Sequence, residues 1–247
     1  MISMLDEPIL TPPEVGSFRL NDHLDQFRIV AIGDSNTECS RWERPQRWTG
    51  ILESFIGSQC KVVNAGMGGT SSNLGLFRWH RDVSPVKPHC VVINFILNDS
   101  YIRHYECRSS YVVQCTPDRM DSNLCNMVNF AKAIGASCVF WTSPPVPDWP
   151  DNFKRRTNFE IQKEILNSYV KIIERIARDL DVPLVNFWEI FPSIVKDYPG
   201  PYFNHPDGYH SNEKSQPIIA KGIAEAVKPI FERWLGKEVG EKDEILY

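Results

Sequence analysis

The sequence predicts an α/β fold in which a parallel sheet of about five strands lies between two layers of helices. The first observation behind this prediction is that short apolar runs rich in β-branched residues alternate with longer segments of helical periodicity. The second is that each run is hydrophobic throughout, which is typical of a strand covered on both faces. Because alternating strands and helices connect by right-handed crossovers, the sheet should be parallel and the architecture three-layered, α/β/α.

Five strands and three of the helices can be placed along the chain. We expect the strands at residues 29–32, 61–64, 90–97, 138–142 and 184–187. Thr116 and Pro117 suit an N-cap and a first helical position, so a helix should run from there to Gly135. A capping-box spacing, TNFE, introduces an amphipathic helix over residues 157–180. The last helix should cover residues 215–234, because its proline falls in the first turn, where proline is tolerated.

These elements form a single expected domain. A chain of 247 residues, 42% of them hydrophobic, can bury one sizeable core. We place the domain at residues 27–235, after an N-terminal extension at residues 1–26 and before a charged tail at residues 236–247. No segment repeats with a period typical of solenoids, and no low-complexity tract is present.

Composition and charge exclude several classes of protein. The formal net charge of −4, without a cluster of Lys and Arg, argues against a nucleic-acid partner, which requires a basic face. The seven cysteines are irregularly spaced and include no CxxC pair, so we predict neither a metal site nor a disulfide framework, and no cofactor. No long apolar run and no signal-peptide pattern is present, which predicts a cytoplasmic protein without a membrane partner.

Polar or glycine-rich turns follow the first three strands. Ser35 comes directly after the first strand, the glycine-rich stretch at residues 66–69 after the second, and Asn98 after the third. Since the carboxyl ends of parallel strands meet at one edge of the sheet, where such folds bind ligands, these turns should converge. Gly, Asp and Ser also favour turns for conformational reasons alone, so each turn taken singly has a purely structural interpretation.

A carboxylate and an imidazole lie close together near the other end of the chain. Asp207 stands three residues before His210 in the stretch DGYH, just ahead of the last helix. A catalytic histidine needs an acceptor on its second ring nitrogen, and a carboxylate at this spacing in a loop can supply it. The alternative is that His210 only caps or packs near the start of the helix.

Together, the stretches IGDSNTE, NAGMGGTS, ILND and DGYH resemble, in order and location, the four blocks of the SGNH or GDSL hydrolase family. The resemblance covers the whole predicted domain and implies a flavodoxin-like sheet, the SGNH hydrolase fold. It implies that Ser35 is the nucleophile of a serine ester hydrolase, with His210 as the base and Asp207 as its partner. It also implies that the backbone N–H groups of Ser35 and Gly69 and the side chain of Asn98 form the oxyanion hole.

The implied residue types suit acyl transfer. A serine hydroxyl attacks an ester only when a base takes its proton, and the resulting oxyanion needs preorganised donors, each worth roughly 2.7 to 4 kcal/mol. The third block departs from the family, because Ile96 stands where glycine is usual. Either Ile96 and Leu97 line a small acyl pocket, or the site binds without turnover. The first interpretation is favoured because the other implied site residues are all present.

The substrate class depends on two long loops, residues 99–116 and residues 144–156. Tyr101 and Trp149 in these loops would offer flat faces to a sugar, or would form a hydrophobic lid. We therefore expect a short acyl ester, first of all an acetyl ester, on a small molecule or a carbohydrate. The alternatives are a lysophospholipase or thioesterase and a noncatalytic carbohydrate-binding protein. A nucleotide-binding loop at NAGMGGTSS is disfavoured, because it lacks the lysine of a P-loop. The oligomeric state is left open.

Overall fold

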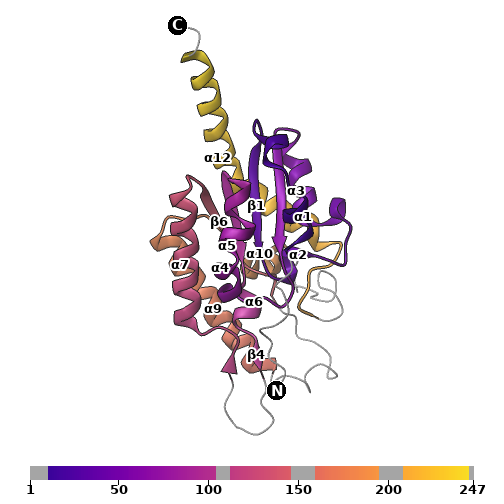
Figure 1. The fold of residues 1–247 in the computed structure, drawn as a ribbon. Helices are drawn as coiled ribbons and strands as arrows, with labels where there is room; N and C mark the ends of the chain where they lie inside the picture. The colour runs from indigo at the N-terminus through magenta and orange to yellow at the C-terminus, as the bar shows by residue number, and fades with distance from the viewer. Residues whose placement is uncertain (1–10, 104–111, 146–158, 195–207, 245–247) are drawn as a thin grey trace.

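A computed structural model describes residues 11–103, 112–145, 159–194 and 208–244 (Figure 1). It contains a parallel sheet of five strands in the order β2-β1-β3-β6-β7. The strands are β1 (Phe27–Gly33), β2 (Cys60–Gly66), β3 (Cys90–Asn94), β6 (Ser137–Trp141) and β7 (Leu184–Val185). Every residue of β1 and β3 is buried, as the unbroken apolar runs predicted. The predicted α/β fold is confirmed.

The strand order and the register bring three strand ends together. β1 pairs with β2 up to Gly33 and Gly66, and β1 pairs with β3 up to Gly33 and Asn94. This order is that of a doubly wound sheet, in which the direction of winding reverses between β1 and β3. Folds of this kind bind ligands beyond the carboxyl ends of the strands at that reversal. The turn after β1 therefore lies where a site is expected.

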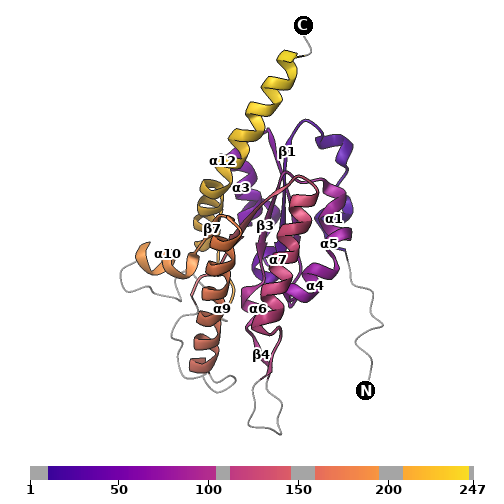
Figure 2. The same ribbon diagram turned by 90° about the vertical axis from the view of Figure 1, so that its left-hand side faces the viewer.

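Helices cover both faces of the sheet (Figures 1 and 2). One face carries α4 (Ser72–Phe77), α5 (Trp79–Asp82), α7 (Pro117–Ala133) and α9 (Phe159–Asp179). The other carries α3 (Trp48–Ile56), α10 (Phe187–Ile194) and α12 (Ser215–Glu244). Alternate strand residues point to the two faces, so Val30 lies in one core cluster and Ile29 in the other. Each fully buried aliphatic side chain contributes roughly 1.5–3 kcal/mol, so the two clusters account for most of the stabilisation.

Shorter elements connect these layers. They are α1 (Pro13–Ser17), α2 (Ser35–Glu38), α6 (Ile96–Asp99), the 3₁₀ turns η1 (Leu20–His23), η2 (Arg44–Gln46) and η3 (Ser84–Val86), and the antiparallel pair β4 (Ile102–Arg103) and β5 (Val112–Val113). Within the described parts of the chain, no helix combines the length and the apolar character needed to cross a membrane.

Two strands end earlier than the sequence suggested. β3 stops at Asn94, whose Oδ1 accepts the backbone N–H of Ile96 at 3.1 Å, and the chain then turns into α6. The predicted strand over residues 90–97 therefore includes three residues too many, because the apolar run continues through a helical turn. β7 is only Leu184–Val185, and Phe187 is the first residue of α10 instead of the end of a strand.

The described residues outside the predicted domain form helices and contacts with its core. α12 continues to Glu244 instead of ending near Trp234, so most of the expected charged tail is helical and extends away from the sheet (Figure 1). Before β1, Val15 and Phe18 pack against the core, and the Glu14 carboxylate accepts the N–H of Asn64 at 3.1 Å. Part of the N-terminal extension therefore belongs to the folded body.

Candidate active site

The turn after β1 holds Ser35 close to the strand ends because two glycines leave room for α2. A Cβ atom on Gly33 would lie 2.5 Å from the carbonyl oxygen of Asn94, and a Cβ on Gly66 would lie 2.1 Å from the backbone nitrogen of Glu38. Neither approach is possible for a residue with a side chain. The first turn of α2 therefore sits directly on the rim of the sheet, with Ser35 half-buried at its start.

The side chains of Ser35 and His210 meet at this rim. His210 Nε2 lies 2.8 Å from Ser35 Oγ, although the two residues are 175 positions apart in the sequence. When the ring proton is on Nδ1, the serine hydroxyl can donate to Nε2, which is the arrangement needed for proton transfer from a nucleophile to a base. Asp207, the expected partner of His210, lies outside the described residues, as does Trp149.

The glycine-rich loop after β2 lies against the serine. A Cβ atom on Gly68 would come 3.8 Å from the Cβ of Ser35, and the N–H of Gly68 donates to the Glu38 carboxylate at 2.8 Å. Gly69 adopts φ +71°, a conformation that favours glycine, and its carbonyl accepts the side chain of Gln114 at 3.0 Å. Glu38 and Gln114 therefore fix the loop that contains Gly69 beside the nucleophile.

Asp34 lies directly beneath this site, between Asn98 and His210. Its side chain caps α2, with Oδ1 accepting the N–H of Asn36 at 2.9 Å, and is fully buried. Burial raises the pKa of Asp34 from 3.8 to about 6, while the N–H of Asn36, the charge of His210 and the amide of Asn98 act in the opposite direction. Asn98 itself, on α6, is half-buried at the rim. Asn98 and His210 thus both interact with Asp34, the residue before Ser35, and Gly69 follows Gly68 in the loop against Ser35.

Ile96 and Leu97 do not line an open pocket beside the serine. Their side chains are only 1% and 6% exposed, and both belong to the core cluster under α4, α7 and α9. The α6 turn directs them into the core and leaves almost no surface for a substrate, so their contact with an acyl group stays a prediction that this burial argues against. Tyr101 is 36% exposed, beside the short β4–β5 pair.

A cavity of about 190 Å³ opens on the His210 side of Ser35. Its lining comes from the first turn of α2 and the loop after it, from the glycine-rich loop and from the His210 segment: Ser35, Asn36, Glu38, Cys39, Ser40, Arg41, Trp42, Gly68, His210 and Ser211. Most of these side chains are polar. Sequence reasoning did not identify Asn36, Glu38 or Gln114, and the sequence signal for the first two was their place within the first block.

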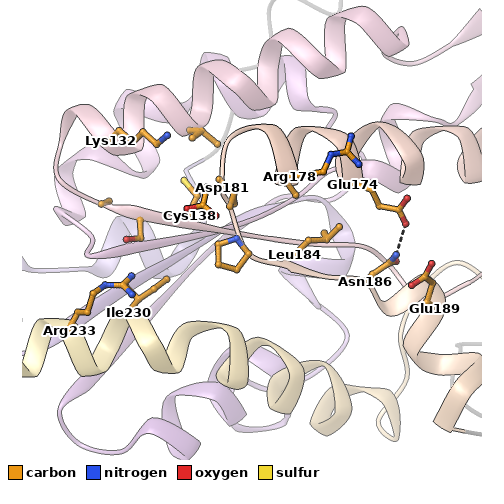
Figure 3. A pocket seen from close by; sticks show the side chains of 16 residues that line it. Lys132, Cys138, Glu174, Arg178, Asp181, Leu184, Asn186, Glu189, Ile230 and Arg233 are labelled. Atoms are coloured by element: carbon orange, nitrogen blue, oxygen red, sulfur yellow. Dashed lines mark hydrogen bonds between the residues drawn. The ribbon is translucent and has the colours of Figure 1, made fainter.

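A larger cavity of about 820 Å³ lies along β7, between α7, α9 and α12 (Figure 3). Figure 3 shows charged side chains of both signs in its walls, with Glu174 accepting a hydrogen bond from Asn186 at 2.7 Å. Among the described residues no histidine lines it, and burial raises the pKa of the Cys138 thiol to about 12, so that thiol is inert. The contact between a serine hydroxyl and an imidazole described above has no counterpart among the described residues of this cavity.

The family assignment follows from a comparison with known proteins. Residues 31–216 match the GDSL-like Lipase/Acylhydrolase family. The chain belongs to this family. Its membership identifies it as a carboxylic ester hydrolase and confirms the resemblance inferred from the four sequence blocks.

Individual relatives share a quarter of their aligned residues or fewer with this chain. An uncharacterized lipoprotein, YqeF, of Bacillus subtilis is 25% identical over 222 residues, covering 79% of this chain and 87% of the relative. The Thioesterase 1/protease 1/lysophospholipase L1 of Escherichia coli K12 is 25% identical over 202 residues, covering 82% and 84%. The crystal structure of an acetyl xylan esterase, AlAXEase, is 18% identical, with a TM-score of 0.65 and coverage of 81% of this chain and 99% of that one. This last similarity concerns the fold.

Proposed function

We propose that the chain hydrolyses short acyl esters, acetyl esters first, through an acyl-enzyme on Ser35. The observation that carries this proposal is the 2.8 Å contact between His210 Nε2 and Ser35 Oγ at the carboxyl end of β1. Ser35 Oγ attacks the ester carbonyl while His210 takes its proton, and the tetrahedral intermediate collapses as His210 returns that proton to the leaving oxygen. A water molecule, deprotonated by His210, then releases the acid. We assign Asp207 to orienting His210.

The oxyanion would be held by the backbone N–H groups of Ser35 and Gly69 and by the side chain of Asn98. Support comes from the interaction of Asn98 with Asp34, the residue before Ser35, and from the contact of Gly68, the residue before Gly69, with Ser35. Preorganised donors of this kind stabilise the negative charge that develops on the carbonyl oxygen, and each is worth roughly 2.7–4 kcal/mol.

The cavity on the His210 side is the place for the leaving group. His210 must protonate the leaving oxygen, so the alcohol has to face its Nε2, and this cavity is lined by both His210 and Ser35. Its volume of about 190 Å³ is below the range of roughly 300–1,000 Å³ of drug-sized sites, so it suits a small alcohol. The carboxylate of Glu38 and the ring of Trp42 in its walls suit a hydroxylated one, such as a sugar.

A short acyl group is favoured because the cavity at Ser35 has a volume of only about 190 Å³, which leaves little room for a long chain beside the alcohol. The second candidate is a thioesterase or lysophospholipase, which is the description carried by the Escherichia coli relative. A noncatalytic carbohydrate-binding role is disfavoured, because binding alone does not require an imidazole in contact with a serine hydroxyl.

The proposal is tested by labelling with a fluorophosphonate and by substrate panels. Wild-type protein should be modified at Ser35, as identified by peptide mass spectrometry, and Ser35→Ala should neither react nor hydrolyse esters. Initial rates on p-nitrophenyl esters from acetyl to decanoyl should fall with chain length and should exceed those on matched thioesters. Rates that rise toward decanoyl, or that favour thioesters, would instead support the second candidate. Absence of both labelling and turnover in folded protein would leave the binding role.

A further inference from the structure

The residue next to the nucleophile bonds to the backbone on both sides of the base. Asn36 Nδ2 donates to the carbonyl oxygen of Tyr209 at 3.1 Å, and Asn36 Oδ1 accepts the N–H of Ser211, also at 3.1 Å. One side-chain amide therefore holds the peptide groups that flank His210. The bonds join α2 to a segment more than 170 positions away in the sequence.

The orientation of this amide is determined by its partners. A backbone carbonyl only accepts and a backbone N–H only donates, so the nitrogen of Asn36 has to face Tyr209 and the oxygen has to face Ser211. Asn36 is 1% exposed, so water does not compete for these bonds. Removal of the amide would take away the bond to the buried N–H of Ser211, and a buried group left unpaired costs about 1–3 kcal/mol.

Asn36 is itself held firmly. Its N–H donates to Asp34 Oδ1 at 2.9 Å, and its carbonyl oxygen accepts the indole N–H of Trp48 at 3.0 Å. Gln216 closes the network, since its amide donates to the Ser211 hydroxyl at 2.8 Å and accepts the backbone N–H of Trp48 at 2.8 Å. The amide of Asn36 therefore projects from a buried network that joins α2, α3 and α12.

We propose that Asn36 is a positioning residue that sets His210 Nε2 against Ser35 Oγ. The proposal rests on the function proposed for these two side chains. Ser35 and Asn36 are adjacent, so the bonds of the Asn36 side chain fix the backbone at His210 relative to the nucleophile. A misplacement of about 1 Å between reacting groups reduces a rate roughly 100-fold, so a clamp on both sides of the base should govern turnover more than substrate binding.

The first test compares Asn36→Ala with wild type and with Asn186→Ala. Asn186 also makes two side-chain hydrogen bonds, to Thr142 at 3.2 Å and to Glu174 at 2.7 Å, but it lies after β7, three strands from Ser35. In Asn36→Ala, kcat for p-nitrophenyl acetate should fall about 100-fold while KM changes less than about threefold. The rate of fluorophosphonate labelling at Ser35 should fall in parallel, and Asn186→Ala should keep both rates.

The second test uses Asn36→Asp, which separates positioning from folding. A carboxylate still accepts the N–H of Ser211, but it cannot donate to Tyr209, and its negative charge favours the protonated imidazole. The profile of kcat/KM against pH should therefore move upward along the pH axis relative to wild type. The shift comes from the added charge, so the discriminating quantity is the plateau of kcat per folded molecule, which should fall if Asn36 positions His210 and should stay at the wild-type level if Asn36 only supports the fold.

The outcomes distinguish the two proposals. If wild-type Ser35 is not labelled, the proposed function fails whatever the variants do. If wild type is labelled and Asn36→Ala keeps kcat within about threefold, or Asn36→Asp reaches the wild-type plateau of kcat per folded molecule, the positioning role is overturned. Circular dichroism gives the folded fraction of each variant, and if Asn36→Ala does not fold, the plateau of Asn36→Asp decides.

Discussion

Asp99 should make the protein less stable as the pH rises, and Asp99→Asn should remove that effect. The carboxyl group is fully buried beside α4, where Oδ1 accepts the N–H of Ser72 at 2.7 Å, and among the described residues Oδ2 has no hydrogen-bond partner. Burial raises the pKa of Asp99 from 3.8 to about 7, Ser72 acts in the opposite direction, and the nearby charge of Asp34 adds to the increase.

The sign and the size of this pH effect follow from the difference between the pKa of Asp99 in the folded state and its pKa in the unfolded state. Because the pKa of the folded state lies above that of the unfolded state, the stabilisation is fully present below pH 3.8 and is lost as the pH rises through 7. A difference of about 3 pH units corresponds to about 4 kcal/mol in total, of which about 1.4 kcal/mol is lost between pH 6 and pH 8.

Among the described residues, Asp34 and His89 also have shifted pKa values that make stability depend on pH between about 4 and 7. The informative quantity is therefore the difference in the free energy of unfolding between Asp99→Asn and wild type at each pH. The pKa of Asp34, raised to about 6 by burial, gives a smaller effect of the same sign. The pKa of His89, lowered to about 4 mainly by burial, gives stability that is present above about pH 6.5 and is lost as the pH falls toward 4. Both groups remain in Asp99→Asn and therefore cancel to first order.

Urea unfolding at pH 5, 6, 7 and 8 measures the difference directly. The free energy of unfolding of Asp99→Asn relative to wild type should increase by about 1.4 kcal/mol from pH 6 to pH 8. Asp118→Asn, which changes an exposed carboxylate in the first turn of α7, serves as the control and should give a profile parallel to wild type. If the profile of Asp99→Asn were also parallel to that of wild type, ionisation of Asp99 in the folded state would cost little free energy, and the raised pKa would be wrong.

Three further changes have defined outcomes. His210→Ala should be inactive toward p-nitrophenyl acetate at every pH while unfolding like wild type, and retained turnover would remove His210 as the base. Gly75→Ala should destabilise the fold by about 1–3 kcal/mol in urea unfolding, because the new Cβ would lie 2.2 Å from the Phe95 ring, and an unchanged midpoint would contradict that crowding. Ile96→Ala should cost about 2–5 kcal/mol of stability with acetyl still preferred over octanoyl, and a switch to octanoyl would show that Ile96 limits chain length.

The sequence predicted the sheet well because its signal is local. Unbroken apolar runs marked all five strands, and glycine-rich or polar turns marked where the first two end. The end of β3 was missed because Phe95, Ile96 and Leu97 continue the apolar run, and hydrophobicity alone does not distinguish a buried strand from a buried helical turn. The side chain of Asn94, which bonds the N–H of Ile96 and ends the strand, carries no such pattern.

The site was predictable where residue types are unusual and was missed where they are common. Ser35 and His210 stood out because their sequence blocks combine turn-forming residues with a side chain that can act as a nucleophile or as a base. The structure brings the two side chains into contact. Ile96 and Leu97 were assigned to the substrate because the sequence does not reveal which way a short helical turn points its side chains. Gln114 was missed because its partner is the backbone carbonyl of Gly69, and any sequence presents that group.

The geometry of the rim also depends on Arg78, which no sequence pattern singled out because it bonds to backbone groups that any sequence presents. Arg78 is 1% exposed and donates to the carbonyl oxygens of Ala65, at 2.6 Å, and Gly33, at 3.0 Å, which lie at the ends of β2 and β1. Its charge is tolerated in the interior because the buried carboxylate of Asp82 lies 2.7 Å away. Since the turn with Ser35 follows Gly33 and the loop with Gly69 follows β2, one guanidinium fixes the spacing between this turn and this loop. In sequence, Arg78 is a single cation at the end of a short helix, and only its bonds to backbone groups distant along the chain separate it from a surface residue.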